Sequence, residues 1–491
     1  MAYSPPFDNS YARLPERFFA RVEPMRPPQP RLVALNTGLA AELGLDAGWL
    51  AGDEGLQWLS GRVVAEGSDP IAQAYAGHQF GNFVPQLGDG RAILLGEVVD
   101  RNGRRRDIQL KGSGRTPFSR GGDGRAAIGP VLREYIVSEA MAAMGVPTTR
   151  SLAAVTTGDE VFRDRALPGA ILTRVAASHI RIGTFQYFAA RGDEEALRLL
   201  ADHVIARHYP DAAGAANPYS ALLDGVIAAQ ADLIARWLHI GFIHGVMNTD
   251  NMSIAGETID YGPCAFMDVY DAAAVFSSID VGGRYAYGNQ PNIGLWNLTR
   301  FAETLLPLID ADEEAAIAKA QEALGLFGPR FQTAYADGLR RKVGFSASED
   351  GDEALISDLL TAMRQNEVDF TLFFRRLGAA IEAGTGDEPL RGLFIDPTRC
   401  DAWLGQWRAR LAREPVPATE RRAAMDAVNP AFIPRNHRVE AAIQAAEQDD
   451  FRPFERLMTV LARPFEDQPE HQDLAAPPLP EERVLRTFCG T

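Results

Sequence analysis

The chain has 491 residues, of which 46% are hydrophobic and 23% charged, as in ordinary globular proteins. Its 49 basic and 65 acidic side chains give a net charge of −16, which argues against nucleic acid as the main partner. No run reaches the ~18 apolar residues of a membrane span, no secretory leader is recognisable, and three cysteines are too few for a disulfide framework. We therefore expect a soluble, cytoplasmic, monomeric protein without nucleic-acid or membrane partners.

The sequence pattern divides the chain into five segments. We expect an N-terminal extension in residues 1–60, a β-rich lobe with a nucleotide-binding loop in 61–176, and the catalytic part of a helical lobe in 177–300. A helical extension is expected in 301–465, followed by a flexible tail in 466–491 that is rich in Pro and Glu at its start.

Hydrophobic periodicity and turn residues predict the elements of the first three segments. In chain order they are a β-hairpin of residues 92–99 and 107–111 around Asn102-Gly103, a helix at 128–144, strands around 152–162 and 169–176 with a turn at 156–159, and a long helix at about 219–240. A β-rich lobe, one helix, more strands and then a helical lobe is the order of a protein kinase. The prediction is an α+β, protein-kinase-like, two-lobed fold with an N-terminal extension and helical C-terminal additions.

Residues 244–262 keep the spacing of two kinase motifs. His244 and Asn251 occupy their places in the catalytic loop H-x-D-x-x-x-x-N, and Asp260-Tyr261-Gly262 stands where the metal-binding D-F-G follows. Val246 replaces the catalytic Asp, so the usual proton acceptor is missing. Asn251 and Asp260 are the residue types that hold metal ions on a nucleoside triphosphate.

A hairpin is expected to bring these two metal ligands together. The short runs 252–254 and 258–259 flank a turn at 255–257, and pairing them would place Asn251 and Asp260 at one end of strands ~4.8 Å apart. Two oxygen ligands at that spacing can share one Mg²⁺. The alternative is that both are ordinary polar residues of a turn.

Upstream residues resemble the remaining parts of a kinase nucleotide site. Gly88-Asp89-Gly90-Arg91 precedes a strand, where a Gly-rich turn can present backbone N–H groups to phosphate. Lys111 ends a strand and Glu134 lies in the next helix, as in the kinase Lys–Glu pair. Taken singly, Lys111 reads as a surface lysine and Glu134 as an exposed helix residue.

Arginines in this acidic chain indicate an anionic ligand. The loop 112–127 alternates five glycines with Arg115, Arg120 and Arg125, a composition suited to wrapping a polyphosphate. Arg174 lies near the end of a strand and Arg181 follows closely. The alternative for the loop is a mobile surface segment.

Several motifs closely resemble the selenoprotein O (SelO) family over essentially the whole chain. They are Ala76-Gly77-His78-Gln79-Phe80-Gly81, Gln109-Leu110-Lys111-Gly112-Ser113-Gly114, residues 244–251, Asp260-Tyr261-Gly262-Pro263, Asn429-Pro430 and Pro434-Arg435-Asn436-His437. The resemblance implies a kinase-like fold that binds ATP in a flipped orientation and transfers AMP, not phosphate, to hydroxyl side chains of proteins.

The resemblance also implies roles for individual residues. Asp250 would be the proton acceptor, Asn251 and Asp260 would bind Mg²⁺ with Mn²⁺ as the alternative metal, and Lys111 would contact phosphate and pair with Glu134. The nucleotide-contacting residues would be Gly88, Gly90, Arg91, Lys111, Asp123, Gly124, Arg174, Arg181 and Asp260, with Arg174 and Arg181 on the phosphates.

The resemblance draws attention to two cysteines as well. Cys489 lies third from the end, where family members carry selenocysteine or cysteine, and Cys264 follows Asp260 by four residues. The hypothesis is a disulfide that tethers the tail across the site and lowers activity when oxidised. The alternative is two unpaired thiols, which a reducing compartment favours.

Three functions remain open from the residues alone. The first is a protein adenylyltransferase that acts on Ser, Thr or Tyr with ATP as substrate. The second is a phosphotransferase in which Asp250 substitutes for the absent loop Asp. The third is a catalytically inactive nucleotide-binding scaffold, which Val246 favours and the retained metal-site residues oppose.

Overall fold

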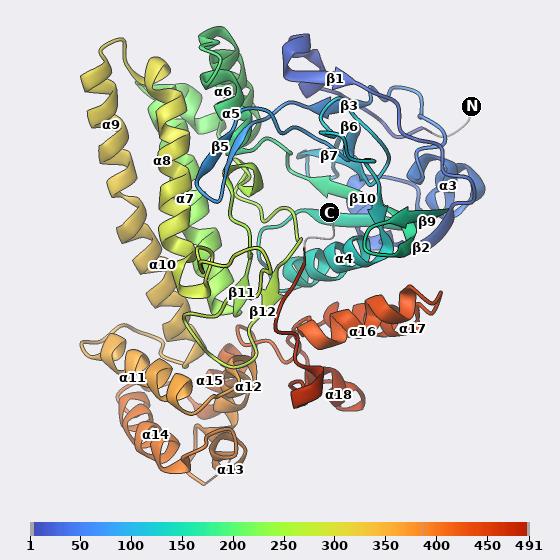
Figure 1. Ribbon diagram of the computed structural model, residues 1–491. Helices are drawn as coiled ribbons and strands as arrows, with labels where there is room; N and C mark the ends of the chain where they lie inside the picture. Colours follow the sequence, from blue (N-terminus) through green and yellow to red (C-terminus); the bar gives the residue numbers. More distant parts are fainter. Residues whose placement is uncertain (1–3, 385, 489–491) are drawn as a thin grey trace.

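The computed structural model describes residues 4–384 and 386–488 and combines one large antiparallel sheet with many helices (Figure 1). The α+β class predicted from the sequence is confirmed. Within the described residues, no helix combines the length and the apolar character needed to cross a membrane.

The strands are β1 (Phe19–Arg21), β2 (Arg31–Leu35), β3 (Ile71–Gln73), β4 (Gly77–Gln79), β5 (Asn82–Val84), β6 (Ala92–Val99), β7 (Arg105–Lys111), β8 (Ala126–Ala127), β9 (Arg150–Phe162), β10 (Ala166–Ala176), β11 (Phe242–Ile243) and β12 (Ala265–Phe266).

The helices are α1 (Thr37–Leu43), α2 (Ala47–Ala51), α3 (Asp53–Leu59), α4 (Ile128–Ala143), α5 (Ile182–Ala189), α6 (Glu194–His208), α7 (Pro218–His239), α8 (Gln290–Ile309), α9 (Glu313–Gly325), α10 (Phe327–Lys342), α11 (Asp352–Gln365), α12 (Phe370–Leu377), α13 (Asp387–Arg391), α14 (Pro397–Leu411), α15 (Ala418–Asp426), α16 (Asn436–Ala446), α17 (Arg452–Leu461) and α18 (Gln472–Ala475).

The main sheet has the strand order β1-β3-β6-β7-β10-β9-β2, with β8 paired to β10. Every pairing in it is antiparallel. Both edge strands come from the first 60 residues, because β1 pairs with β3 and β2 pairs with β9. The segment expected as an N-terminal extension therefore contributes directly to the sheet.

The β6–β7 hairpin carries Lys111 to the site. It forms as predicted, with its first strand at 92–99 and its second beginning two residues earlier than expected, at Arg105. Gly103 at the tip has φ +76°, a left-handed conformation that glycine adopts without strain. The register places Lys111 opposite Ala92 on one side and Leu172 of β10 on the other.

The turn predicted at 156–159 is wrong. These residues lie inside β9, and the chain reverses at 163–165, where Phe162 pairs with Ala166. Gly158 has φ +77°, and the pairing register shifts between Pro168 and Ala170. The turn-like composition therefore encodes a β-bulge, in which extra residues bend a strand without ending it.

Helix α4 places Glu134 against the sheet. It spans the predicted helix 128–144 to within one residue and contacts β9 and β10, while α16 and α17 pack against it (Figure 1). Gly145, at φ +75°, follows the helix end. Because α4 has neighbours on both sides, Glu134 is buried, with 4% of its surface exposed.

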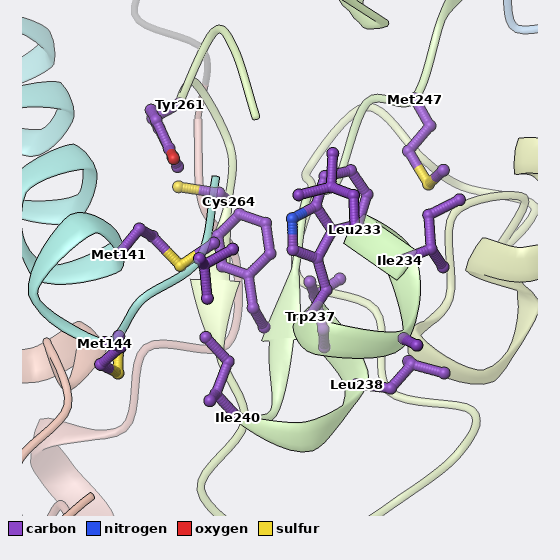
Figure 2. Close-up of a cluster of buried hydrophobic side chains, with 14 of the residues drawn as sticks. Met141, Met144, Leu233, Ile234, Trp237, Leu238, Ile240, Met247, Tyr261 and Cys264 are labelled. Atoms are coloured by element: carbon purple, nitrogen blue, oxygen red, sulfur yellow. The ribbon is translucent and has the colours of Figure 1, made fainter. Parts of the chain in front are cut away.

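Helix α7 confirms the predicted helix 219–240 and leads into the catalytic-loop segment. Asn217 caps it by accepting hydrogen bonds from the backbone of Tyr219 and Ser220. Figure 2 shows Trp237 of α7 at the centre of a core cluster, with Tyr261, Cys264 and Met141 of α4 on one side. The α7 residues Leu233, Ile234 and Leu238 lie on the other side, near Met247. This core fixes the loop segments of the site between α4 and α7.

The predicted helical extension forms α8 to α17. The segment expected as a flexible tail contains α18 and 3₁₀ turns at Pro469–His471 and Pro480–Glu482. Near its end Thr487 is buried, forms a β-bridge with Ser277, and donates from Oγ1 to the Pro263 carbonyl oxygen at 2.5 Å.

Candidate active site

Two short strands join the segments that carry Asn251 and Asp260. β11 pairs with β12, which brings residue 243 opposite residue 265. His244 is buried, and its Nε2 lies 2.9 Å from the carbonyl oxygen of Ile259. Asn251 donates from Nδ2 to the Val246 carbonyl oxygen at 3.0 Å, so its Oδ1 remains available as a ligand for a cation.

The hairpin predicted from 252–254 and 258–259 does not form. Ser253 makes its bridge with Arg181, and Thr258 makes its bridge with Thr148. Runs of three and two residues offer too few mutual hydrogen bonds to compete with these longer-range partners. The turn itself is present, with Gly256 at φ +72°. Asn251 and Asp260 nevertheless line one cavity.

Three cations converge on the Asp260 carboxylate. Lys111 Nζ lies 2.8 Å and Arg174 Nη1 2.7 Å from Oδ1, and Arg181 Nη1 lies 2.5 Å from Oδ2. Glu134 supplies the second anion, 2.6 Å from Lys111 and 3.1 Å from Arg174. We refer to these five side chains as the Asp260 cluster.

The Asp260 cluster carries one more positive than negative charge. Burial by itself would raise the pKa of Asp260, but Lys111, Arg181 and Arg174 hold that pKa well below its usual range. The pKa of Glu134 is also lowered, because the same two partners, Lys111 and Arg174, outweigh its burial. Both carboxylates are therefore ionised at neutral pH, and the excess charge favours an anionic ligand.

Asp250 lies next to this cluster, but its pKa is shifted in the opposite direction from those of Asp260 and Glu134. Burial raises the pKa of Asp250 to about 6, although Arg181 acts in the opposite direction. Its Oδ2 accepts a hydrogen bond from Gln79 Nε2 at 3.3 Å, and its Oδ1 is buried without a hydrogen-bond partner among the described residues. A carboxylate with a raised pKa and an oxygen without a hydrogen-bond partner can accept a proton.

The Gly88–Arg91 turn and the Gly/Arg loop 112–127 meet closely. A Cβ on Gly88, which has φ +79°, would stand 2.3 Å from the Phe118 ring, and one on Gly90 would stand 2.9 Å from the Phe118 carbonyl oxygen. Gly124 likewise approaches Gly114, where a Cβ would stand 2.1 Å from the carbonyl oxygen. Glycine is therefore required by the close Phe118 ring at Gly88 and by close backbone approach at Gly90 and Gly124.

These segments enclose a cavity of about 730 Å³. Every residue predicted to bind nucleotide or metal lines it, as does Asp250: Gly88, Gly90, Arg91, Lys111, Asp123, Gly124, Arg174, Arg181, Asp250, Asn251 and Asp260. Glu134 lies behind Lys111, in an adjoining small pocket. The structure thus brings together residues from four distant stretches of sequence.

The cavity concentrates positive charge in an acidic protein. Eight cationic side chains and four carboxylates of the described chain line it: Arg91, Lys111, Arg115, Arg120, Arg125, Arg163, Arg174 and Arg181, against Asp89, Asp123, Asp250 and Asp260. Arg91, Arg115 and Arg120 make no salt bridge with any described residue. Such a surface is chemically suited to a polyphosphate.

Several residues that line the cavity were not predicted from the sequence. Tyr75, Gln79 and Asn248 line the cavity, and Arg163 forms a salt bridge with Asp123 at 2.9 Å. Arg181 lies over the Tyr75 ring, 4.7 Å from its centroid. The spacing of Gln79 from other polar residues implies no chemistry. Its place in the 76–81 motif is the signal that could have pointed to it.

The structure describes only one of the two cysteines of the predicted redox pair. Cys264 is buried and follows Pro263, which lines the cavity. Cys489 lies outside the described residues, so the pairing stays a prediction.

The donor set is compatible with a nucleotide-bound magnesium ion. Asn251 and Asp260 offer the oxygen ligands that Mg²⁺ prefers, and Mg²⁺ commonly completes its coordination with phosphates and water. In the part of the chain that the structure describes, no group of three or more His, Cys, Asp or Glu side chains could hold a metal ion. Asn251 and Asp260 thus fit a metal ion whose other ligands are phosphate and water.

The geometry defines a cationic cavity that is chemically suited to a polyphosphate, and comparison with known proteins identifies the family. A family model described as protein adenylyltransferase SelO matches residues 3–462. A protein nucleotidyltransferase YdiU of Bradyrhizobium diazoefficiens is 66% identical over 487 residues, which cover 99% of each chain. Relatives of the same name from Methylorubrum populi (66% over 493 residues, 99% of each chain) and Rhodopseudomonas palustris (65% over 493 residues, 100% of each chain) are similar.

The chain belongs to the SelO family and is a nucleotidyltransferase enzyme. The resemblance inferred from the sequence motifs is thereby confirmed. The scaffold alternative loses its basis, because the relatives carry the name of an enzyme.

Proposed function

We propose that the protein transfers AMP from ATP to Ser, Thr or Tyr hydroxyls of other proteins and releases pyrophosphate. The observation that carries this proposal is the Asp260 cluster beside Asp250, an anion site next to a carboxylate whose pKa burial raises to about 6. The names of the relatives, protein nucleotidyltransferase, support proteins as substrates.

The nucleotide would bind with its phosphates at the Asp260 cluster. Lys111, Arg174 and Arg181 already lie within 2.9 Å of one carboxylate, and phosphate oxygens would accept hydrogen bonds from the same three groups. In the inverted pose implied by the family resemblance, Gly88, Gly90 and Arg91, with Asp123 and Gly124, would contact the rest of the nucleotide. A protein-kinase-like arrangement of two lobes belongs to the same proposal and is supported by the order of sheet, α4 and helical bundle (Figure 1).

Asn251 and Asp260 would hold Mg²⁺, or Mn²⁺ as the alternative. When bound, the metal would neutralise charge that develops on the phosphates. Asn251 offers Oδ1 because its Nδ2 is engaged with Val246. Asp260 would exchange part of its contact with the three cations for the metal, while those cations move to phosphate.

Asp250 would act as the general base in the transfer step. The acceptor O–H bond breaks and its proton passes to the Asp250 carboxylate, while the acceptor oxygen bonds to the α-phosphorus. The bond from that phosphorus to the oxygen bridging to the β-phosphorus breaks, and pyrophosphate leaves. A base with a pKa of about 6 suits this task at neutral pH, because it is ionised yet retains proton affinity.

The test is which phosphate of ATP becomes attached to protein. Reduced enzyme is incubated with Mg²⁺, an acceptor protein mixture and ATP labelled at the α or the γ position, with Asp250→Asn as the catalytic control and Asp260→Ala as the metal control. Label transferred from the α position alone supports the proposal. Label from the γ position alone would make the enzyme a phosphotransferase with a displaced base, and label from neither would contradict both.

A further inference from the structure

The hairpin β4–β5 is a small separate sheet, and Figure 1 shows its strand β5 apart from the main sheet, near α5 and α8. Strand β4 contacts the turn Thr249–Asn251 of the catalytic loop. Its register pairs Gly77 with Val84 and Gln79 with Asn82, so Phe80 and Gly81 form a two-residue turn. Both turn residues have positive φ, +52° at Phe80 and +86° at Gly81, as a type I′ turn requires. A bulky residue is strained in that conformation, and such strain persists only where neighbours enforce it.

The catalytic loop supplies the contacts that hold this turn. The Phe80 backbone N–H donates to Asn248 Oδ1 at 3.0 Å, and the Tyr285 hydroxyl donates to the same oxygen at 2.6 Å. The His78 backbone N–H donates to Thr249 Oγ1 at 2.7 Å. The residues contacted on the loop, Asn248 and Thr249, directly precede Asp250, so the hairpin and the loop are fixed to one another.

Between these two anchors the hairpin reaches the Asp250 carboxylate itself. Gln79 Nε2 donates to Oδ2 at 3.3 Å, and no other described side chain donates a hydrogen bond to this carboxylate. On the other side, a Cβ on Gly77 would stand 2.8 Å from Oδ1 and 3.1 Å from the Asp250 Cβ. The carboxylate is thus held by an amide donor and packed against a glycine, both from the same short strand.

We propose that Gln79 is a positioning residue that orients the Asp250 carboxylate toward the acceptor hydroxyl, with hairpin β4–β5 as its rigid support. The proposal rests on the function proposed above for Asp250. An amide suits this role because it can donate to the carboxylate without competing for the proton that Asp250 takes up. Positioning groups of this kind contribute to the rate through orientation and leave nucleotide affinity unchanged.

The kinetic test compares Gln79→Met, which removes the donor, with Asn82→Ala, which alters the facing, exposed position of the same hairpin. We expect Gln79→Met to lower kcat for AMP transfer about tenfold with an unchanged KM for ATP, and Asn82→Ala to match the wild type. Gly77→Ala, whose methyl group would displace Asp250, should show the same split. A changed KM for ATP with normal kcat, or an equal loss in Asn82→Ala, would overturn the proposal.

A second measurement does not depend on the reaction. The free energies of unfolding of the wild type, Gln79→Met, Asp250→Ala and the double variant form a double-mutant cycle. Effects that are coupled support the contact, and strictly additive effects would overturn it. If the wild-type enzyme transferred no AMP, the proposed function would fail, and this cycle alone would decide whether Gln79 acts through Asp250.

Discussion

Replacing Glu134 by Gln tests the charge balance of the Asp260 cluster. Glu134 is 4% exposed and accepts hydrogen bonds from Lys111 and Arg174. Removing one partner of a buried ion pair costs about 3–5 kcal/mol, and Asp260 remains as a partner for both cations, so we expect about 3 kcal/mol. At about 2.1 cal/mol/K per residue, a 491-residue chain that unfolds as one unit has an unfolding entropy near 1 kcal/mol/K, so Tm should fall by about 3 °C.

Nucleotide should restore much of that loss, because phosphates supply the missing negative charge. The assay is thermal unfolding of wild type and Glu134→Gln, each with and without Mg²⁺ and a non-hydrolysable ATP analogue. The matched control is Glu139→Gln on the same helix, where Glu139 pairs with Arg150 at 2.7 Å and does not line the main cavity. An unchanged Tm in Glu134→Gln, or equal rescue of both variants, would refute the reasoning.

Three further predictions concern the base, the Gly-rich turn and a buried lysine. Asp250→Asn should lower the rate of AMP transfer at least about 100-fold and leave the affinity for ATP unchanged. Transfer of the α-label measures the rate, and calorimetry measures the affinity. A variant with wild-type activity would show that Asp250 is not the base. Gly88→Ala should lose about 1–3 kcal/mol of stability in urea and bind nucleotide more weakly, since its methyl group would meet the Phe118 ring; wild-type behaviour would contradict that contact. Burial lowers the pKa of Lys342 to about 7. Between about pH 7 and 10.5 the unfolded chain therefore binds more protons at this lysine than the folded chain does. The free energy of unfolding, relative to that of Lys342→Met, should rise with pH across that window. Urea unfolding at pH 6.5 and pH 9 checks the sign, and a pH-independent difference would contradict it.

Long elements with regular periodicity were predictable from the sequence. Helices α4 and α7 repeat apolar residues at helical spacing over many turns and stop at glycines, so local signals agree with the packing. The β6–β7 hairpin has a tip of Asn102 and Gly103 between two strand-like runs, which is a strong local signal. In each case the decisive information lies within a few residues of the element.

Short elements were not predictable, because distant partners decide them. The runs around Gly256 read as a hairpin, yet Ser253 and Thr258 pair with segments more than 70 residues away. Gly158 has the local composition of a turn. It lies inside a strand because the pairing of β9 with β10 accommodates a bulge there, and that pairing cannot be read from the residues around Gly158. The edge strands β1 and β2 depend in the same way on β3 and β9.

The candidate site was predictable in residue type and not in geometry. Kinase-like spacing pointed to Lys111, Glu134 and Asp260, the arginine pattern pointed to Arg174 and Arg181, and the family resemblance assigned the base role to Asp250. No sequence rule states that three cations meet at one carboxylate, because that arrangement depends on the register of β7 with β10 and on the bridge of Arg181 with Ser253.

The bridge between Thr487 and Ser277 has a consequence for the timing of assembly. Thr487 lies 224 residues after Pro263 in the sequence and donates from Oγ1 to the Pro263 carbonyl oxygen, and Pro263 lines the cavity. This part of the wall joins two segments that are distant in the sequence, so it can close only after both have been synthesised, and the segment around Pro263 waits for the later one.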